Sequence, residues 1–132
     1  MKNVLTITLN PAVDKSSAVD RIAPEKKLRC ETPVFQPGGG GINVSRGLIR
    51  LGVDSTSFFL AGGRTGALLE ELVQEENVKV NPFRVSGNTR ENFIVVESST
   101  NQQYRFGMPG NEITKAEQSG ILETISSMTP FP

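Results

Sequence analysis

Residues 36–45 read Gln-Pro-Gly-Gly-Gly-Gly-Ile-Asn-Val-Ser, and this stretch decides the fold. After the glycines, apolar residues recur at helical spacing, at Val44, Leu48 and Leu51, so a helix is predicted from the glycines to Gly52. Consecutive glycines at a helix entrance let the backbone approach a ligand and direct free N–H groups toward it. The stretch therefore predicts a ligand site built on a loop–helix junction.

The residue types around the glycines narrow the class of ligand. Asn43 occupies the position of the third glycine of a dinucleotide-binding fingerprint, and no Gly-Lys-Ser/Thr follows as in a Walker loop. On the first helical turn, the amide of Asn43 can both donate to and accept from vicinal hydroxyls. This pattern favours a polyol over a nucleotide phosphate.

The flanking segments predict an α/β layer. Strands are expected at 3–9, 55–61 and 79–85, because short apolar or alternating runs there are bounded by turn residues. A second helix, capped by Thr65 and closed by Asn77, would bury Leu68, Leu69, Leu72 and Val73. A third, opened by the capping box at 114–117, would bury Ile121, Leu122 and Ile125. Strand–helix alternation predicts a parallel sheet flanked by helices.

Further extended segments do not fit that layer. Residues 17–22 and 27–35 look like strands with one solvent-exposed face, and 92–98 with 102–106 look like a hairpin. We expect these segments, within the approximate bounds 16–35 and 90–107, to pair as a small antiparallel β lid over one edge of the layer.

Composition excludes several function classes. The 132 residues carry 14 basic and 14 acidic side chains, and this zero net charge argues against a nucleic-acid or acidic-membrane partner. No apolar run approaches a membrane span, and the strand-like start without a cleavage site predicts a cytoplasmic protein. With no histidine and the single Cys30, histidine-based nucleophilic catalysis, zinc sites built on imidazole and thiolate metal clusters are excluded, and no metal site is expected.

Residues 39–45, followed by Gly52 and Gly62, resemble the first signature of the ribokinase-like (pfkB) carbohydrate kinases. The segments at 8–14, 25–30, 89–92 and 103–106 resemble its sugar-phosphate branch, in particular the minor bacterial type of ATP-dependent 6-phosphofructokinase. The resemblance covers all of residues 1–132 but only the N-terminal portion of such an enzyme. It implies a ribokinase-like fold and transfer of the ATP γ-phosphate, with Mg²⁺, to a phosphorylated ketohexose. Fructose 6-phosphate is the expected acceptor.

The resemblance also assigns roles to residues. Asp14 would accept hydrogen bonds from sugar hydroxyls, Gly39 and Gly40 would give close backbone approach, and Asn43 would fix a hydroxyl pair. The cations expected to hold the substrate's phosphate are Lys27, Arg29 and Arg90. Arg105 would hold the phosphate either in its own site or in that of a neighbouring subunit. The lid would also form a homodimer interface, so some of these cations would serve the neighbouring subunit's site.

Structural interpretations remain open beside these roles. Asp14 could cap the turn after Asn10-Pro11, and Lys27 and Arg29 alternate as solvated edge residues do. Arg90 and Arg105 carry no signal of their own without the resemblance. Asn43 has few structural roles on a first helical turn after four glycines.

One element of the family pattern is missing. Its Gly-Ala-Gly-Asp stretch, whose Asp is the catalytic base, has no counterpart in the chain, and neither has the nucleotide-binding C-terminal portion. The resemblance of residues 88–91 to the family's metal-associated Asn-x-x-Glu is interpreted as coincidence. The chain stops after a helix at 130–132, where another strand would be expected. We therefore expect an inactive chain without bound ATP, with an exposed sheet edge, that self-associates through the lid or that edge.

Three functions remain open from the sequence. The first is the sugar-binding portion of a kinase for fructose 6-phosphate, with fructose 1-phosphate and tagatose 6-phosphate as alternative substrates. The second is a non-catalytic module for sugar-phosphate binding or dimerisation. The third is a nucleoside kinase of the same superfamily, which the cations of the lid disfavour because a nucleoside has no phosphate for them to hold.

Overall fold

The computed structural model describes residues 3–129, so the predicted ending at 130–132 lies outside the described residues. The helices and strands follow in the order β1 (Leu5–Thr8), β2 (Ala12–Val19), β3 (Val34–Gly38), α1 (Gly40–Arg50), β4 (Thr56–Ala61), α2 (Gly63–Glu75), β5 (Lys79–Arg84), β6 (Arg90–Glu97), β7 (Gln102–Phe106) and α3 (Lys115–Ser126). The strands form two separate sheets.

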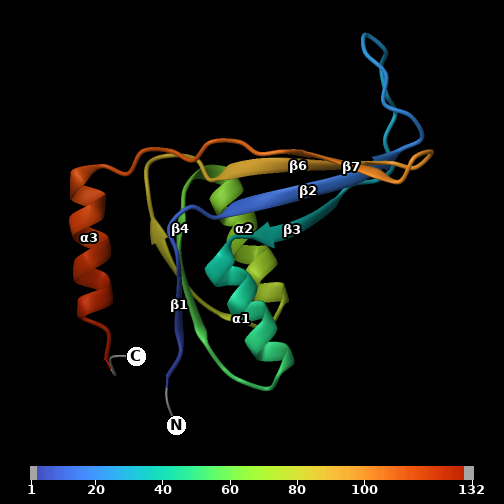
Figure 1. Cartoon of the computed structure of the whole chain (residues 1–132). Coiled ribbons are helices and arrows are strands. Elements are labelled where there is room, and N and C mark those ends of the chain that lie inside the picture. The colour runs from blue at the N-terminus through green and yellow to red at the C-terminus, as the bar shows by residue number, and fades with distance from the viewer. Residues whose placement is uncertain (1–2, 130–132) are drawn as a thin grey trace.

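The first sheet is parallel, in the order β1-β4-β5, as the sequence predicts. The helices α1 and α2 lie together on one face and α3 lies on the other (Figure 1). Side chains therefore alternate along β4: Phe59 and Ala61 pack in the core beneath α1 and α2, whereas Phe58 and Leu60 pack against Ile121 of α3. The predicted α/β layer is confirmed.

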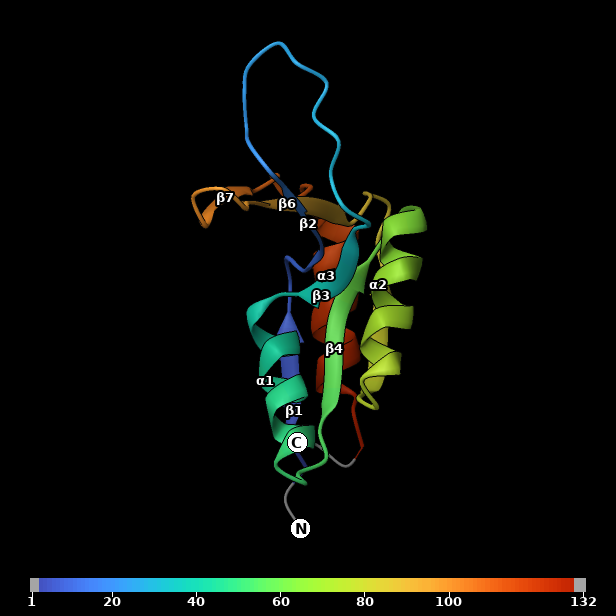
Figure 2. The same cartoon turned by 90° about the vertical axis from the view of Figure 1, so that its right-hand side faces the viewer.

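The second sheet, which we call the lid, has the order β3-β2-β6-β7 and crosses the end of the first sheet (Figures 1 and 2). Its outer pairs, β2 with β3 and β6 with β7, are antiparallel, but the central pair, β2 with β6, is parallel. The predicted pairing of these segments is confirmed. The lid is therefore mixed rather than antiparallel throughout, because β2 and β6 run in the same direction.

The strand expected over 27–35 is also wrong over most of its length. Residues 20–33 form an irregular loop, here called the arm, and β3 begins only at Val34 (Figure 2). Every residue from Pro24 to Gln36 is exposed, so the apparent alternation of Leu28 and Cys30 with charged neighbours marks no buried face. β2 instead starts earlier than predicted, at Ala12.

Two further details of the helices differ from expectation. Thr65 does not cap α2, which begins at Gly63 with Gly62 as N-cap, because Thr89 supplies the distant hydrogen-bond partners of Gly62. The capping box of α3 at Thr114 is confirmed, and Ile121 is buried, but Leu122 is 67% exposed. α3 thus buries a narrow stripe rather than a broad face.

Within residues 3–129 no helix has the length and apolar character needed to span a membrane.

Candidate functional site

The four glycines stand in one run but meet different constraints. A Cβ on Gly38 would lie 2.6 Å from Asp14 Oδ2, and one on Gly41 would lie 2.7 Å from the carbonyl oxygen of Ile7. Gly39 has φ +130° and would clash with Thr8. Packing and backbone conformation therefore require these three glycines.

Gly40 is different, because a Cβ there would meet nothing within 4 Å and its φ is not in the left-handed region. It is the first residue of α1, where backbone N–H groups have no partner inside the helix. Thr8 Oγ1 accepts from Ile42 N at 3.1 Å, so Thr8 fixes the start of the helix. Asn43, on this first turn, is exposed. The arrangement leaves an accessible backbone platform beside an amide side chain.

Asp14 lies on β2 beside this platform, because Gly38 of β3 makes room for its carboxylate. The amide of Asn92, its register partner on β6, donates to Asp14 Oδ1 at 3.3 Å. Met108 N donates to Asn92 Oδ1 at 2.8 Å, which orients the amide so that its nitrogen faces Asp14. Asp14 is thus positioned within the lid rather than free at a turn, and its half-buried carboxylate keeps acceptor capacity for hydroxyls.

Sequence reasoning did not place Asn92 in the site; the only local signal was its spacing of two residues from Arg90, and its pairing with Asp14 is tertiary. Arg90 and Asn92 are two apart on a strand, so they share a face with Ala12 and Asp14, their partners on β2. Arg105 of β7 is the register partner of Ile94 and belongs to the same face. We call this side of the lid, with Asp14, Arg90, Asn92 and Arg105, the polar face.

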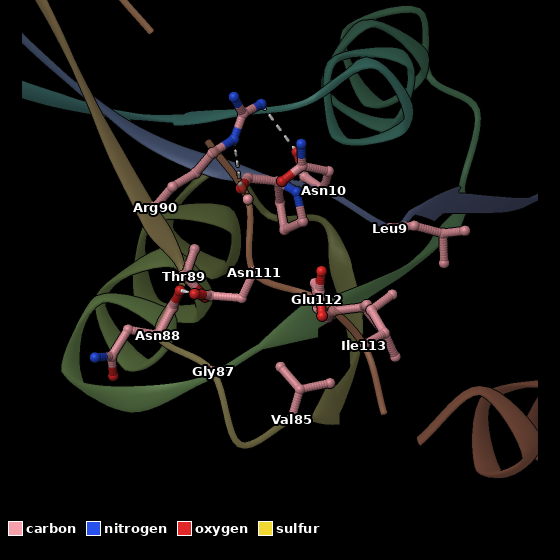
Figure 3. Close-up of a pocket in the computed structure, with 13 residues that line it drawn as sticks. Leu9, Asn10, Val85, Gly87, Asn88, Thr89, Arg90, Asn111, Glu112 and Ile113 are labelled. Atoms are coloured by element: carbon pink, nitrogen blue, oxygen red, sulfur yellow. Dashed lines mark hydrogen bonds between the residues drawn. The ribbon is translucent and has the colours of Figure 1, made fainter. Parts of the chain in front are cut away.

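Each of the three guanidinium nitrogens of Arg90 donates to a backbone carbonyl. It donates to the carbonyls of Met108 at 3.0 Å and Asn10 at 3.1 Å, with a longer contact to Pro11 at 3.4 Å. Figure 3 shows the guanidinium turned toward the β1–β2 connection above a small pocket. Arg90 therefore ties together the segments that border the site.

The pocket in Figure 3 lies at the carboxyl ends of β1, β4 and β5. Its apolar part is formed by Leu60, Val85 and Ile113, and Asn10, Asn111 and Arg90 are among its polar residues. Ligand sites of open α/β sheets are found at this end of the strands. Of the predicted site residues, only Arg90 lines it.

Lys27 and Arg29 lie apart from the other predicted residues. Both belong to the exposed arm, which projects beyond the end of the lid, away from the start of α1 (Figures 1 and 2). The structure therefore brings together Asp14, Gly39, Gly40 and Asn43 beside the polar face with Arg90 and Arg105. It does not bring Lys27 and Arg29 to them within one chain.

The described residues give no sign of a metal site. Among residues 3–129, no group of three or more Cys, Asp or Glu side chains is placed to hold an ion. In the segment that resembles Asn-x-x-Glu, the side chain of Asn88 packs against Gly63. The side-chain amide of Asn111 donates to the backbone carbonyl of Asn88. These contacts give Asn88 a structural role.

The chain matches the family model described as "pfkB family carbohydrate kinase" over residues 4–126. It is 45% identical over 122 residues to an ATP-dependent 6-phosphofructokinase isozyme 2 of Mycobacterium tuberculosis, covering 92% of this chain and 36% of that protein. It is 29% identical over 124 residues to a 1-phosphofructokinase of Xanthomonas campestris, covering 94% of this chain and 39% of that one.

The same similarity holds in three dimensions. The crystal structure of Escherichia coli phosphofructokinase-2 in complex with fructose-6-phosphate superimposes with a TM-score of 0.90 at 41% identity, covering 97% of this chain and 42% of that one. The chain thus spans less than half the length of these relatives, and the similarity extends through both its sheets.

Proposed function

Because the chain belongs to the pfkB family of carbohydrate kinases, we propose that it is the sugar-holding portion of a sugar-phosphate kinase that acts on a phosphorylated ketohexose. Fructose 6-phosphate is the best candidate, since the most similar of the relatives described above are 6-phosphofructokinases. The observation that carries the proposal is Gly40, which no internal contact requires to be glycine, placed at a helix start beside Asp14 and Asn43.

Each residue has a chemical task in this proposal. Asp14 accepts from sugar hydroxyls while Asn92 holds its carboxylate, and Asn43 donates to and accepts from a neighbouring hydroxyl pair. The substrate's phosphate is held by Arg90 and Arg105 of the polar face through charge-assisted hydrogen bonds. Lys27 and Arg29 would complete phosphate binding in the site of a second chain, because the arm carries them away from their own.

Phosphoryl transfer needs a base, ATP and Mg²⁺. The chain has no Gly-x-Gly-Asp segment, and its described residues offer no metal cluster. We assign the base and the sites for ATP and Mg²⁺ to the part of such kinases that has no counterpart here, so this chain alone would bind sugar without turnover.

A homodimer formed through the lid belongs to the same proposal. Phe35, Lys15, Phe93 and Phe106 form one row across all four lid strands, on the side opposite Asp14. We call this side the aromatic face. Phe93 is 37% exposed and Phe106 53%, an apolar surface that a second copy would cover.

The test is thermal protection by fructose 6-phosphate. A ligand that binds only the folded chain stabilises it by about 2.7 kcal/mol at a concentration of 100 times its Kd. Asp14→Ala and Asn43→Ala should abolish this protection, whereas Asp54→Ala, at an exposed position after α1, should retain it. Stronger protection by fructose 1-phosphate or tagatose 6-phosphate would identify that sugar phosphate as the substrate instead. Protection by adenosine alone would favour a nucleoside kinase. No protection by any of them would contradict sugar binding and leave a dimerisation module.

A further inference from the structure

The arm is exposed at its tip but fixed where it leaves β2. Ile22 and Ala23 are half-buried, whereas Pro24 and all following residues of the arm are exposed. Figure 1 shows the arm rising beside the turn that joins β6 to β7. The contact between this turn and the start of the arm involves a buried carboxylate.

That carboxylate is Glu97, the last residue of β6, which is only 6% exposed. Its Oε2 accepts from Ile22 N at 2.7 Å, and its Oε1 accepts from the hydroxyl of Thr100 in the turn. These two hydrogen bonds hold the pKa of Glu97 below its ordinary value of 4.5, with the Thr100 contact the larger cause. Glu97 thus connects the β6–β7 turn to the first residues of the arm.

The rest of the arm is also held at defined points. At its far end, Glu31 N donates to Ala18 O at 2.9 Å and Ser17 Oγ donates to Glu31 O at 2.7 Å. At its tip, Pro24 and Glu25 form a turn in which Glu25 has φ +60°. Proline fixes φ at the first central position of such a turn, so the direction of the chain entering Lys27 is restricted.

We propose that Glu97 is a positioning residue for sugar-phosphate binding: by holding Ile22 it fixes the arm, and through the arm the placement of Lys27 and Arg29. This proposal rests on the proposed function. Ion pairs in the described residues are made by other cations, Arg46, Arg50 and Arg84, so the two arm cations are available for an anion. A cation on an unfixed arm would lose conformational entropy on binding a phosphate, and the contact at Glu97 removes much of that cost beforehand.

The first measurement is hydrogen exchange of the Ile22 amide in the whole chain, which requires no ligand. Glu97→Ala should raise its exchange rate about tenfold or more, the size expected for losing a hydrogen bond to a charged group. Glu97→Gln should restore most of the protection, because its carbonyl can accept from Ile22 and its amide can donate to Thr100. Glu117→Ala, which removes a doubly hydrogen-bonded carboxylate in the first turn of α3, is the matched control and should leave the Ile22 exchange rate unchanged.

The second measurement separates positioning from a purely structural role. Titration calorimetry with fructose 6-phosphate should show affinity about three- to tenfold weaker in Glu97→Ala, an effect of about 0.6–1.4 kcal/mol. Affinity for fructose, which has no phosphate, should not change, and Glu97→Gln should recover the loss. An unchanged exchange rate at Ile22 in both variants would overturn the contact. Faster exchange with equal loss of both sugars, or with no loss, would overturn the positioning role while the proposed function stands. If the wild type binds neither sugar, the proposed function and the positioning role both fail, and exchange alone decides whether Glu97 holds the arm.

Discussion

At the scale of single residues, the glycines of the run are required for different reasons, some by the packing and backbone conformation of the chain and one, Gly40, by neither. Gly39 adopts a φ that disfavours any side chain, and Gly38 leaves room for the Asp14 carboxylate. Only Gly40 within the run is free of both constraints, although glycine at a helix position is unfavourable relative to alanine. Gly40 also begins α1 beside Asp14 and Asn43, and it is this position together with the cost that points to close approach of a ligand.

Gly40→Ala therefore separates stability from binding. The variant should be more stable by up to about 1 kcal/mol, because alanine restricts the unfolded chain and favours the helix. It should nevertheless weaken fructose 6-phosphate binding, since the new methyl group occupies the backbone platform. Urea unfolding and calorimetric titration measure the two effects.

Gly47→Ala is the matched control for that experiment. Gly47 lies in the same helix, and a Cβ there would also meet nothing within 4 Å. This variant should gain similar stability without any change in binding. Equal binding by both variants would contradict the role of Gly40.

At the scale of elements, α3 is attached to the first sheet by a carboxylate as well as by packing. Glu117 Oε1 accepts from Thr114 N at 3.0 Å and completes the capping box, and Oε2 accepts from Ser86 N, just after β5, at 2.8 Å. The amide of Thr114, followed by that of Ser86, lowers the pKa of Glu117 from its ordinary value of 4.5. The ionised carboxylate thus fixes the start of α3 against the end of the sheet.

This attachment predicts an acid dependence of stability. Because the pKa is lower in the folded state, the contribution of Glu117 is complete above about pH 4.5 and is lost as the pH falls through the folded-state pKa. The urea midpoint should fall in this range, and Glu117→Gln should be less stable at neutral pH and show a smaller acid loss. An identical pH profile in the variant would contradict the assignment.

At the scale of the whole molecule, the two faces of the lid differ in chemistry. Asp14 and Lys15 are adjacent on β2, so their side chains lie on opposite faces of the sheet. The polar face borders the candidate site, while the aromatic face is exposed. The proposed homodimer through the aromatic face would leave the polar face uncovered, because the two faces lie on opposite sides of the sheet.

This arrangement predicts self-association that a charge on the aromatic face disrupts. The wild type should have about twice the 14.3 kDa mass of one chain in light scattering, and Phe93→Lys should shift it toward the monomer. Phe93 is already 37% exposed, so the fold should tolerate lysine. Val44→Lys, at a position 54% exposed on α1, is the control and should leave the dimer intact. A wild type that stays monomeric at high concentration would contradict the lid interface.

Sequence patterns correctly predicted the features that depend only on residues close together in the chain. The helix after the glycines, the capping box at Thr114 and the turn between β6 and β7 each depend on residues close in sequence, and all three are present. The start of α2 could not be predicted from local residues, because its N-cap Gly62 takes its hydrogen-bond partners from Thr89, far along the chain. Asn92 was missed as a site residue because its contact with Asp14 depends on tertiary pairing.

The lid shows the same limit at larger scale. A strand-like alternation at 27–35 cannot form a strand where no neighbour pairs with it, and most of that segment is the arm. The orientation of β6 relative to β2 is likewise a tertiary property, which alternation in either strand does not encode. Composition and periodicity therefore predicted the layers, while the placement of Lys27 and Arg29 required the structure.

The most direct test of the central claim is a nuclear magnetic resonance titration of the labelled chain with fructose 6-phosphate. If the site is the platform beside Asp14, the amide signals of Gly40 and Asn43 and the side-chain amide of Asn92 should shift together and saturate. The amides of Phe93 and Phe106, whose side chains lie on the aromatic face, should shift much less. Saturable shifts confined to the aromatic face, or no shifts at all, would contradict the claim that this chain holds the sugar.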